Sequence, residues 1–110
     1  MKTGAATAKV TGLNDSVKYQ KNSVVSKELI RKQAGTITLF SFDKGQGLSE
    51  HTAPFDALVY IIDGKARINI GATPFDVKKG EFIILPAGKI HSLKAAAKFK
   101  MMLVMIRSND

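Results

Sequence analysis

Short runs of branched and aromatic residues, each ended by a turn signal, fill most of the chain after residue 23. Branched and aromatic residues favour strands, whereas glycine, proline, asparagine and aspartate favour turns. No segment between the runs reads as a helix of about 10 to 15 residues, so a parallel sheet with crossover helices is not expected. The sequence therefore predicts an all-β fold, either a sandwich or a barrel. The predicted strands are 24–32, 36–43, 57–62, 65–70, 73–77, 81–85, 91–95 and 99–106.

Glycine-containing turns predict how these strands connect. Gln33-Ala34-Gly35 has a length suited to a hairpin, and Asp63-Gly64 is a two-residue hairpin signal between two predicted strands. Gly71-Ala72 turns the chain into the next run. We interpret Gly45-Gln46-Gly47 as a turn before a strand, because a phosphate-binding loop needs a following helix and further glycines.

Two of the predicted strands are apolar on both faces. Every position from 101 to 106 is methionine, leucine, valine or isoleucine. In the run from Leu58 to Ile62, each of the two faces of the strand carries apolar side chains. A strand of this kind is buried on both faces. We therefore expect the outer face of the sheet to be covered by a second copy of the chain in a homodimer, or else by the chain's own N-terminal segment.

Glycine and histidine recur at fixed spacings in two stretches. The first reads Gly45-x5-His51-x-Ala53-x3-Ala57-x6-Gly64 and the second reads Gly80-x5-Pro86-x-Gly88-x2-His91. These spacings resemble the paired motifs of the cupin superfamily, which normally read Gly-x5-His-x-His-x3,4-Glu-x6-Gly and Gly-x5-Pro-x-Gly-x2-His-x3-Asn. The resemblance covers roughly residues 24–106 and implies a cupin-type jelly-roll β-barrel, also called a double-stranded β-helix.

The resemblance also implies a pocket inside the barrel. Cupins hold a divalent metal there with three histidines and the glutamate, but Ala53 and Ala57 occupy two of those four positions in this chain. What the resemblance leaves is a ligand-binding pocket with His51 and His91 on an otherwise apolar wall. Val59 and Ile61, which follow Ala57 at a spacing of two, are expected to face the same interior.

Two histidines alone make a poor metal site, since structural zinc usually has four protein ligands and catalytic zinc or iron usually three. A bulge in the 52–56 turn would bring the Asp56 carboxylate toward the vacant glutamate position, and Glu50 is a less favoured carboxylate. Three alternatives stay open: a site for Fe, Mn, Ni or Zn that includes His51 and His91, a metal-free polar pocket, and histidines with a purely structural role.

Small single-domain cupins with no assigned activity resemble this chain most. The function expected from the pocket is the binding of a small organic ligand. The alternative is a metal-dependent or histidine-only isomerase, epimerase or dioxygenase acting on a small carbohydrate or carboxylic acid, because imidazole titrates near neutral pH and can transfer protons. A third reading, an interaction module, applies if side chains fill the barrel interior.

Length and composition exclude several other classes. At 110 residues the chain is one domain, with residues 1–11 expected as a flexible tail and 12–110 as the barrel. The net charge is +8, but 14 of the 17 cations are lysines without a nucleic-acid recognition pattern, so no nucleic-acid partner is expected. No apolar run reaches the roughly 20 residues of a membrane span and no export signal is evident, so a cytoplasmic protein is expected. Without cysteine, disulfides and thiolate metal sites are excluded.

Overall fold

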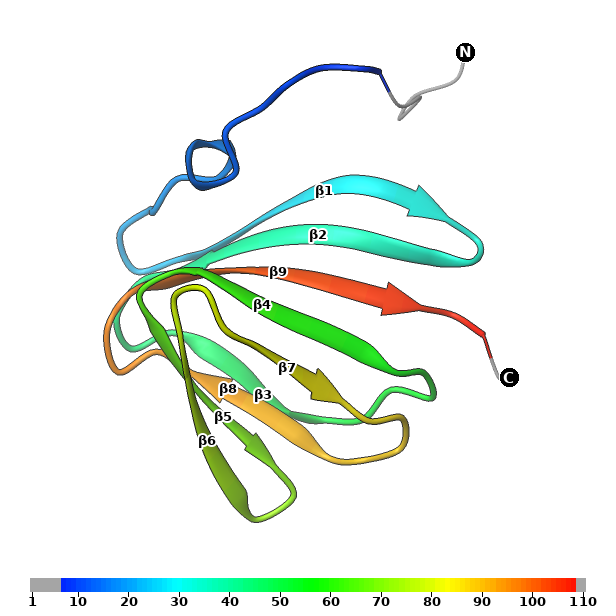
Figure 1. The fold of residues 1–110 in the computed structure, drawn as a ribbon. Helices are drawn as coiled ribbons and strands as arrows, with labels where there is room; N and C mark the ends of the chain where they lie inside the picture. The colour runs from blue at the N-terminus through cyan, green and yellow to red at the C-terminus, as the bar shows by residue number, and fades with distance from the viewer. Residues whose placement is uncertain (1–6, 109–110) are drawn as a thin grey trace.

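A computed structural model describes residues 7–108, and within them it confirms an all-β fold (Figure 1). Nine strands and one short 3-10 turn, η1 (Asn14–Ser16), make up the regular structure of this part of the chain. The strands are β1 (Val24–Lys32), β2 (Gly35–Phe42), β3 (Gly47–His51), β4 (Ala57–Asp63), β5 (Lys65–Ile70), β6 (Thr73–Lys78), β7 (Phe82–Leu85), β8 (His91–Lys94) and β9 (Phe99–Ile106).

The strands form two antiparallel sheets that lie as two layers. One sheet has five strands in the order β1-β2-β9-β4-β7, and the other has four in the order β3-β8-β5-β6. In Figure 1 the first sheet lies above the second, and consecutive strands of the middle of the chain cross from one layer to the other. This is the jelly-roll arrangement that was expected, with the interior between the layers.

The hairpin predicted at Asp63-Gly64 is wrong. The strand before it, β4, pairs with β7 and β9, whereas the strand after it belongs to the other sheet. Gly64 has a φ of 76°, and a Cβ placed on it would lie 2.5 Å from the carbonyl oxygen of Lys98 and 3.1 Å from the Cα of Phe99. The glycine therefore allows a tight corner against the start of β9, where the chain changes sheets.

The other glycine turns agree with the predictions. Gly71-Ala72 joins β5 to β6 in a two-residue hairpin, since Ile70 pairs with Thr73. The first hairpin is closed one residue earlier than expected, because Gly35 already pairs with Lys32. A strand follows the turn at Gly45, as predicted, and it is β3.

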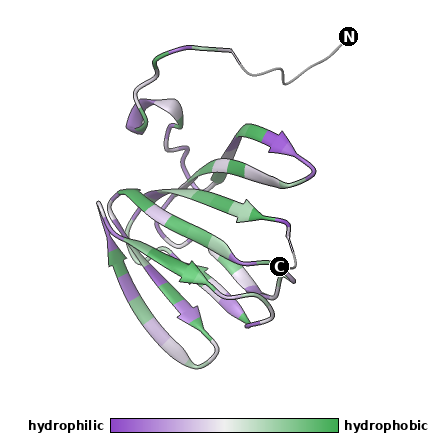
Figure 2. Cartoon of the chain, turned by 45° about the vertical axis from the view of Figure 1, so that its right-hand side comes forward, coloured by the Kyte–Doolittle hydropathy of each residue, from purple (hydrophilic) through white to green (hydrophobic). Residues whose placement is uncertain are grey.

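The interior between the sheets is packed with apolar side chains from alternate positions. Figure 2 shows hydrophobic and hydrophilic segments alternating along several strands, as expected where one face is buried. Phe42 and Phe99 stack at the centre with ring centroids 4.6 Å apart. The buried members of this core are Phe42, Ala57, Val59, Ile61, Ala66, Ile68, Val77, Leu85, Leu93, Ala95, Phe99 and Met101.

The segment before β1 covers part of the outer face of the five-stranded sheet. Val17 is 3% exposed and packs with Leu39 and Ile62, which point away from the main core. The Ser41 hydroxyl donates a hydrogen bond of 2.7 Å to the backbone carbonyl of Lys18. This coverage by the chain's own N-terminal segment is one of the two alternatives predicted for the outer face. Val17 packs at one end of the sheet, and Thr7 and Leu13 border a hollow beside Leu29 and Ile30 of β1.

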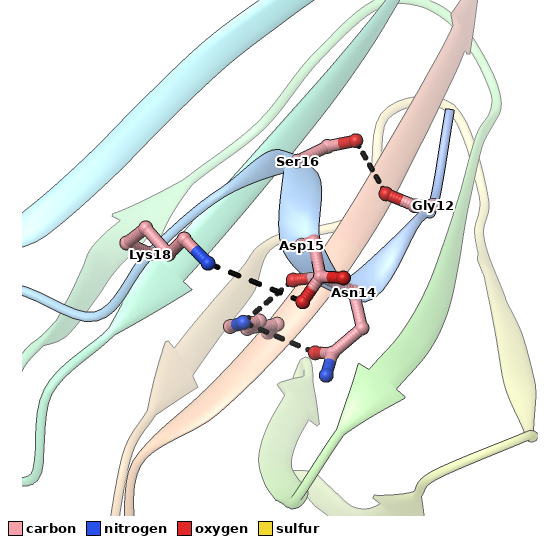
Figure 3. Close-up of polar contacts among 6 residues, drawn as sticks. Gly12, Asn14, Asp15, Ser16 and Lys18 are labelled. Carbon is pink, nitrogen blue, oxygen red and sulfur yellow. Dashed lines mark hydrogen bonds and ion pairs between the residues drawn. The ribbon is translucent and has the colours of Figure 1, made fainter. Parts of the chain in front are cut away.

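Polar contacts fix the same segment at η1 (Figure 3). The buried Lys100 ammonium donates to the backbone oxygen of Asn14 at 2.7 Å and to its side-chain oxygen at 3.0 Å. The Tyr19 hydroxyl donates to Asp63 at 2.7 Å, and burial together with this bond raises the pKa of Tyr19. Of the tail expected at residues 1–11, residues 1–6 lie outside the described part and residues 7–11 are exposed.

No helix among the described residues has the length and apolar character needed to cross a membrane.

Candidate functional site

A bulge in β3 places His51 directly opposite His91. Leu48 of β3 pairs with Leu93 of β8, and the next pair along these two strands is His51 with His91. Two residues of β3, Ser49 and Glu50, therefore occupy the space that one residue occupies in β8. Without this bulge, Glu50 would lie opposite His91, so the extra residue decides which side chain enters the site.

The two imidazoles are in direct contact. Nε2 of His91 lies 3.0 Å from Nε2 of His51, and the ring planes cross at 73°. The other ring nitrogens face backbone carbonyls: Nδ1 of His51 is 2.7 Å from the oxygen of Ser49, and Nδ1 of His91 is 3.2 Å from the oxygen of Lys89. His91 is 6% exposed, whereas His51 is exposed at the rim.

These contacts restrict where the protons of the pair lie. A carbonyl oxygen only accepts, so each Nδ1 contact needs a proton on Nδ1, and the contact between the rings needs one on either Nε2. All three are hydrogen bonds only when the pair carries one positive charge. Two neutral rings keep the two shorter contacts if His51 donates from Nδ1 and His91 donates from Nε2.

Burial decides which of these states dominates at neutral pH. It lowers the pKa of His91 below its ordinary value of 6.5, and the neighbouring His51 lowers that pKa further, while the Lys89 carbonyl opposes the shift. Desolvation disfavours the charged ring. His91 is therefore neutral near pH 7, and its Nε2 hydrogen bond to His51 is the contact that a ligand would have to share or replace.

The histidine pair borders a cavity of about 60 Å³ that is otherwise lined by apolar side chains. Ala53, Ala57 and Val59 line it as the sequence predicted, but Ile61 does not: it is fully buried in the core. The sequence did not single out the remaining lining residues as part of the cavity. Three of them, Met101, Leu103 and Met105, belong to the strand whose sequence is apolar on both faces. The full lining is Leu48, His51, Ala53, Phe55, Ala57, Val59, Leu85, His91, Leu93, Met101, Leu103 and Met105.

The Asp56 carboxylate, which a bulge in the 52–56 turn would bring toward the histidines, lies away from them. The Asp56 side chain is exposed, and its Oδ1 accepts a hydrogen bond of 2.8 Å from the backbone N–H of Ala87. It ties its own turn to the Pro86–Gly88 turn, which also donates to the Ala53 carbonyl at 2.8 Å. The expected bulge lies in β3 rather than in this turn, so nothing swings the carboxylate inward.

The donor set at the cavity does not fit the divalent metal that the fold implies. Nowhere in residues 7–108 do three or more His, Cys, Asp or Glu side chains gather in a way that could hold a metal ion. The cavity offers two imidazoles, and their Nε2 atoms are engaged with each other. Two ligands leave a catalytic zinc or iron at least one protein ligand short.

A larger hollow lies elsewhere on the molecule, between β6 and β7. It has a volume of about 510 Å³ and is open to solvent, with Phe75 and Phe82 among its lining residues. Its charged side chains are two carboxylates, from Asp76 and Glu81, and it contains no imidazole. The histidine cavity is smaller, but it is the one with polar groups that converge on an enclosed apolar space.

Comparisons with known proteins agree on the fold. The sequence profile described as Cupin domain matches residues 38–107. A conserved protein of unknown function from Streptococcus pyogenes has 36% identity over 97% of this chain and 94% of that one, with a TM-score of 0.89. A cupin superfamily protein from Desulfitobacterium hafniense has 27% identity over 96% of both chains, with a TM-score of 0.88.

A third solved structure differs in length. The cupin 2 conserved barrel domain protein from Leptotrichia buccalis is 41% identical over 86% of this chain, with a TM-score of 0.84, but the match covers only 46% of that protein. No protein of curated function matches the sequence. The comparisons therefore confirm the jelly-roll fold that the sequence predicted.

Proposed function

The chain belongs to the cupin family, and from that premise we propose that it binds a small organic molecule in the cavity bordered by His51 and His91. The observation that carries the proposal is the histidine contact at an otherwise apolar cavity: Nε2 of His91 lies 3.0 Å from Nε2 of His51. Ligand pockets in proteins typically combine an apolar lining with a few placed polar groups.

The size of the cavity restricts the ligand. At roughly 15 Å³ for each water, a space of about 60 Å³ holds on the order of four water molecules. The ligand, or the part of it that enters, is therefore a group of a few heavy atoms. The apolar wall requires that most of this group be hydrocarbon, with one polar atom directed at the imidazoles.

The histidine pair suits a ligand that donates or accepts a hydrogen bond. One proton lies between the two Nε2 atoms, and either ring can hold it once the contact is broken. The exposed His51 at the rim is the group that can turn away, because the buried His91 is confined by its neighbours. Binding then exchanges the hydrogen bond between the rings for one to the ligand.

Catalysis by the histidines alone is the rival function, and the Nε2 contact is the observation in its favour. A neutral buried imidazole can act as a general base. Against it, the two histidines are the only titratable side chains among the cavity's lining residues, so the pair alone would have to supply both the acid and the base. The same geometry supports binding without this difficulty.

The proposal is tested by nuclear magnetic resonance with a panel of small amphiphiles, such as isobutyric acid, 2-propanol and isobutylamine. We expect at least one to shift the imidazole Hε1 signals and the methyl signals of Leu103 and Met105, which both line the cavity. His51→Ala should weaken that binding by about tenfold, the equivalent of one hydrogen bond.

A cavity-filling variant separates this site from surface binding. Leu103→Phe should abolish the shifts while leaving both histidines in place, whereas Leu29→Phe, on the exposed part of β1, should leave them unchanged. If no member of the panel shifts these signals, or if binding survives Leu103→Phe, the proposal is wrong. Stoichiometric binding of Zn²⁺ or Fe²⁺ that depends on both histidines would favour a metal-dependent enzyme instead.

A further inference from the structure

Four cations gather at one end of the outer face of the four-stranded sheet. Lys65 on β5 pairs directly with Lys78 on β6. Arg67, two residues further along β5, pairs with Asp76 on one side and with Lys94 on the other. Directly paired residues of an antiparallel ladder point to the same face, as do residues two apart on one strand. All five charged side chains therefore share this face.

The cluster has a strong excess of positive charge. Arg67 donates from Nε to a carboxylate oxygen of Asp76 at 2.6 Å, so this pair balances itself. The three lysines are left, and none of them has a carboxylate within 4.0 Å among residues 7–108. Paired strands lie about 4.8 Å apart, so the lysines lie within roughly one Debye length of their neighbours at physiological salt.

This arrangement is unfavourable for the fold itself. Like charges placed directly opposite each other destabilise a sheet, and here Lys65 faces Lys78 while Arg67 faces Lys94. At the other end of the same face the paired residues are neutral: Asn69 pairs with Ser92 and donates a hydrogen bond of 3.4 Å to it. The pairing of these strands therefore does not require charged residues. An anion bound over the cluster would relieve the repulsion.

The surface is hollowed where the charges meet. A depression of about 270 Å³ is lined by Lys65, Arg67, Asp76, Lys94, Ala96 and Ala97. The two alanines are exposed and too small to fill the space beside Lys65 and Lys94. Arg67 has five N–H groups, and its bonds to Asp76 use only part of them. Donors and cations are thus arranged around a space large enough for a phosphate group.

We infer that this hollow binds a compact multivalent oxyanion, the phosphate or diphosphate group of a small metabolite, through Lys65, Arg67 and Lys94. A compact ligand fits better than an extended polyanion, because only two successive sets of paired residues on this face are charged. The next pair along the strands, Asn69 with Ser92, is neutral. A nucleic acid strand would need cations that follow its backbone along the surface. The site lies on the outside of the sheet, so it is independent of the histidine cavity.

The test is a titration of the protein with inorganic pyrophosphate at low salt, followed by amide chemical shifts. We expect saturable shifts on β5 and β8, and a loss of affinity of about tenfold or more in the Lys65→Ala/Lys94→Ala double variant. The matched control is Lys27→Ala/Lys32→Ala on β1, which removes the same charge from exposed positions of the other sheet and should leave the affinity unchanged. Both variants should fold, since all four side chains are exposed.

Two further arms identify the source of the phosphate. Phosphatidylglycerol vesicles and a short single-stranded RNA are titrated against the same variants, and His51→Ala is included because it should bind pyrophosphate normally. If the control variant loses as much affinity as the double variant, the anion only follows net charge and the inference is wrong. It is also wrong if the vesicles or the RNA, but not pyrophosphate, depend on Lys65 and Lys94.

Discussion

Nε2 of His91 lies 3.0 Å from Nε2 of His51, although the two residues are 40 positions apart in the sequence. The bulge at Ser49 and Glu50 makes this contact, because it moves His51 into the register position that Glu50 would otherwise occupy opposite His91. A carboxylate there would pair with the buried imidazole and charge it. With the bulge, burial keeps the His91 imidazole of the cavity neutral near pH 7, because it lowers the pKa of His91.

The pH dependence of folding should report the environment of His91. Burial, and secondarily His51, lower the pKa of the folded His91 below 6.5, so below that pH the unfolded chain binds more protons than the folded chain. The stability associated with neutral His91 is therefore present above pH 6.5 and is lost as the pH falls toward the folded pKa. Urea unfolding between about pH 8 and pH 5 should show this loss, and His91→Gln should reduce it.

A second variant separates the two causes of that shift. His51→Gln removes the neighbouring imidazole and its electrostatic effect but leaves His91 buried, so the pKa of His91 should rise and still remain below 6.5. Histidine Hε1 chemical shifts followed against pH measure it directly. A pKa that reaches or exceeds 6.5 in this variant would show that burial is not the main cause.

Among the described residues, Gly64 is the glycine at which a positive φ and a close backbone contact coincide, so it should tolerate a side chain poorly. Alanine at this position meets both a φ of 76° and a carbonyl oxygen, that of Lys98, 2.5 Å from the new Cβ. We expect Gly64→Ala to cost at least about 2 kcal/mol of unfolding free energy. Gly71→Ala is the control, since Gly71 has a φ of 61° and open space around it, and it should cost only about 1 kcal/mol. Equal losses in urea unfolding would mean that the close approach at Gly64 is unimportant.

The strands were predictable from the sequence because the signals for them are local. Period-two apolarity and turn residues gave the positions of eight strands to within about two residues, whereas the change of sheet at Gly64 was missed. Asp63-Gly64 carries the same local signal for a hairpin and for a corner. The distinction depends on where Lys98 and Phe99 pack, and nothing near residue 64 in the sequence records that.

The site was predictable to the extent that the motif spacing fixes backbone register. The spacing predicted that His51 and His91 share one cavity, and the structure brings their rings into contact. The bulge at Ser49 has no local sequence signal, and the hydrogen bond from Ala87 to Asp56 joins two turns whose relative position depends on the completed fold. These two long-range features explain why the sequence did not reveal that the Asp56 carboxylate lies away from the histidines.

The segment before β1 should contribute to stability through a single buried side chain. Val17 is 3% exposed and packs with Leu39 and Ile62, so Val17→Ala should cost about 2 kcal/mol through the lost burial and the cavity left behind. Val10 provides a control in the same segment, because its side chain is fully exposed and Val10→Ala should change nothing measurable. Similar effects of the two substitutions would mean that the segment does not pack on the sheet.

The rest of that outer face is the surface on which we propose that a second copy of the chain packs. One register row is apolar across all five strands, and the N-terminal segment comes near it only at its β1 end, where Thr7 and Leu13 border a hollow together with Ile30. The row consists of Ile84, Leu58, Val104, Ile37 and Ile30. Beside it Phe82 is 62% exposed and Ile106 is 59% exposed. Contiguous apolar surface of this kind usually marks an interface.

The face could form the centre of a homodimer interface. Five strands at about 4.8 Å, each showing about six residues of 3.3 Å, give a patch of roughly 480 Å². A stable interface buries about 800 Å² per partner, so surrounding residues would have to contribute the rest. The longer relative from Leptotrichia buccalis, of which this chain matches 46%, has enough additional chain for a second domain of this size.

Light scattering or sedimentation at micromolar concentration should therefore give twice the chain mass of 11.9 kDa. Val104→Lys places a charge at the centre of the row and should give monomers, because an isologous interface buries the substituted residue twice. Ile90→Lys introduces the same lysine at a residue that is 49% exposed in the loop before β8, and it should leave the dimer intact. A monomeric wild-type protein, or a dimer that survives Val104→Lys, would exclude this face as the interface.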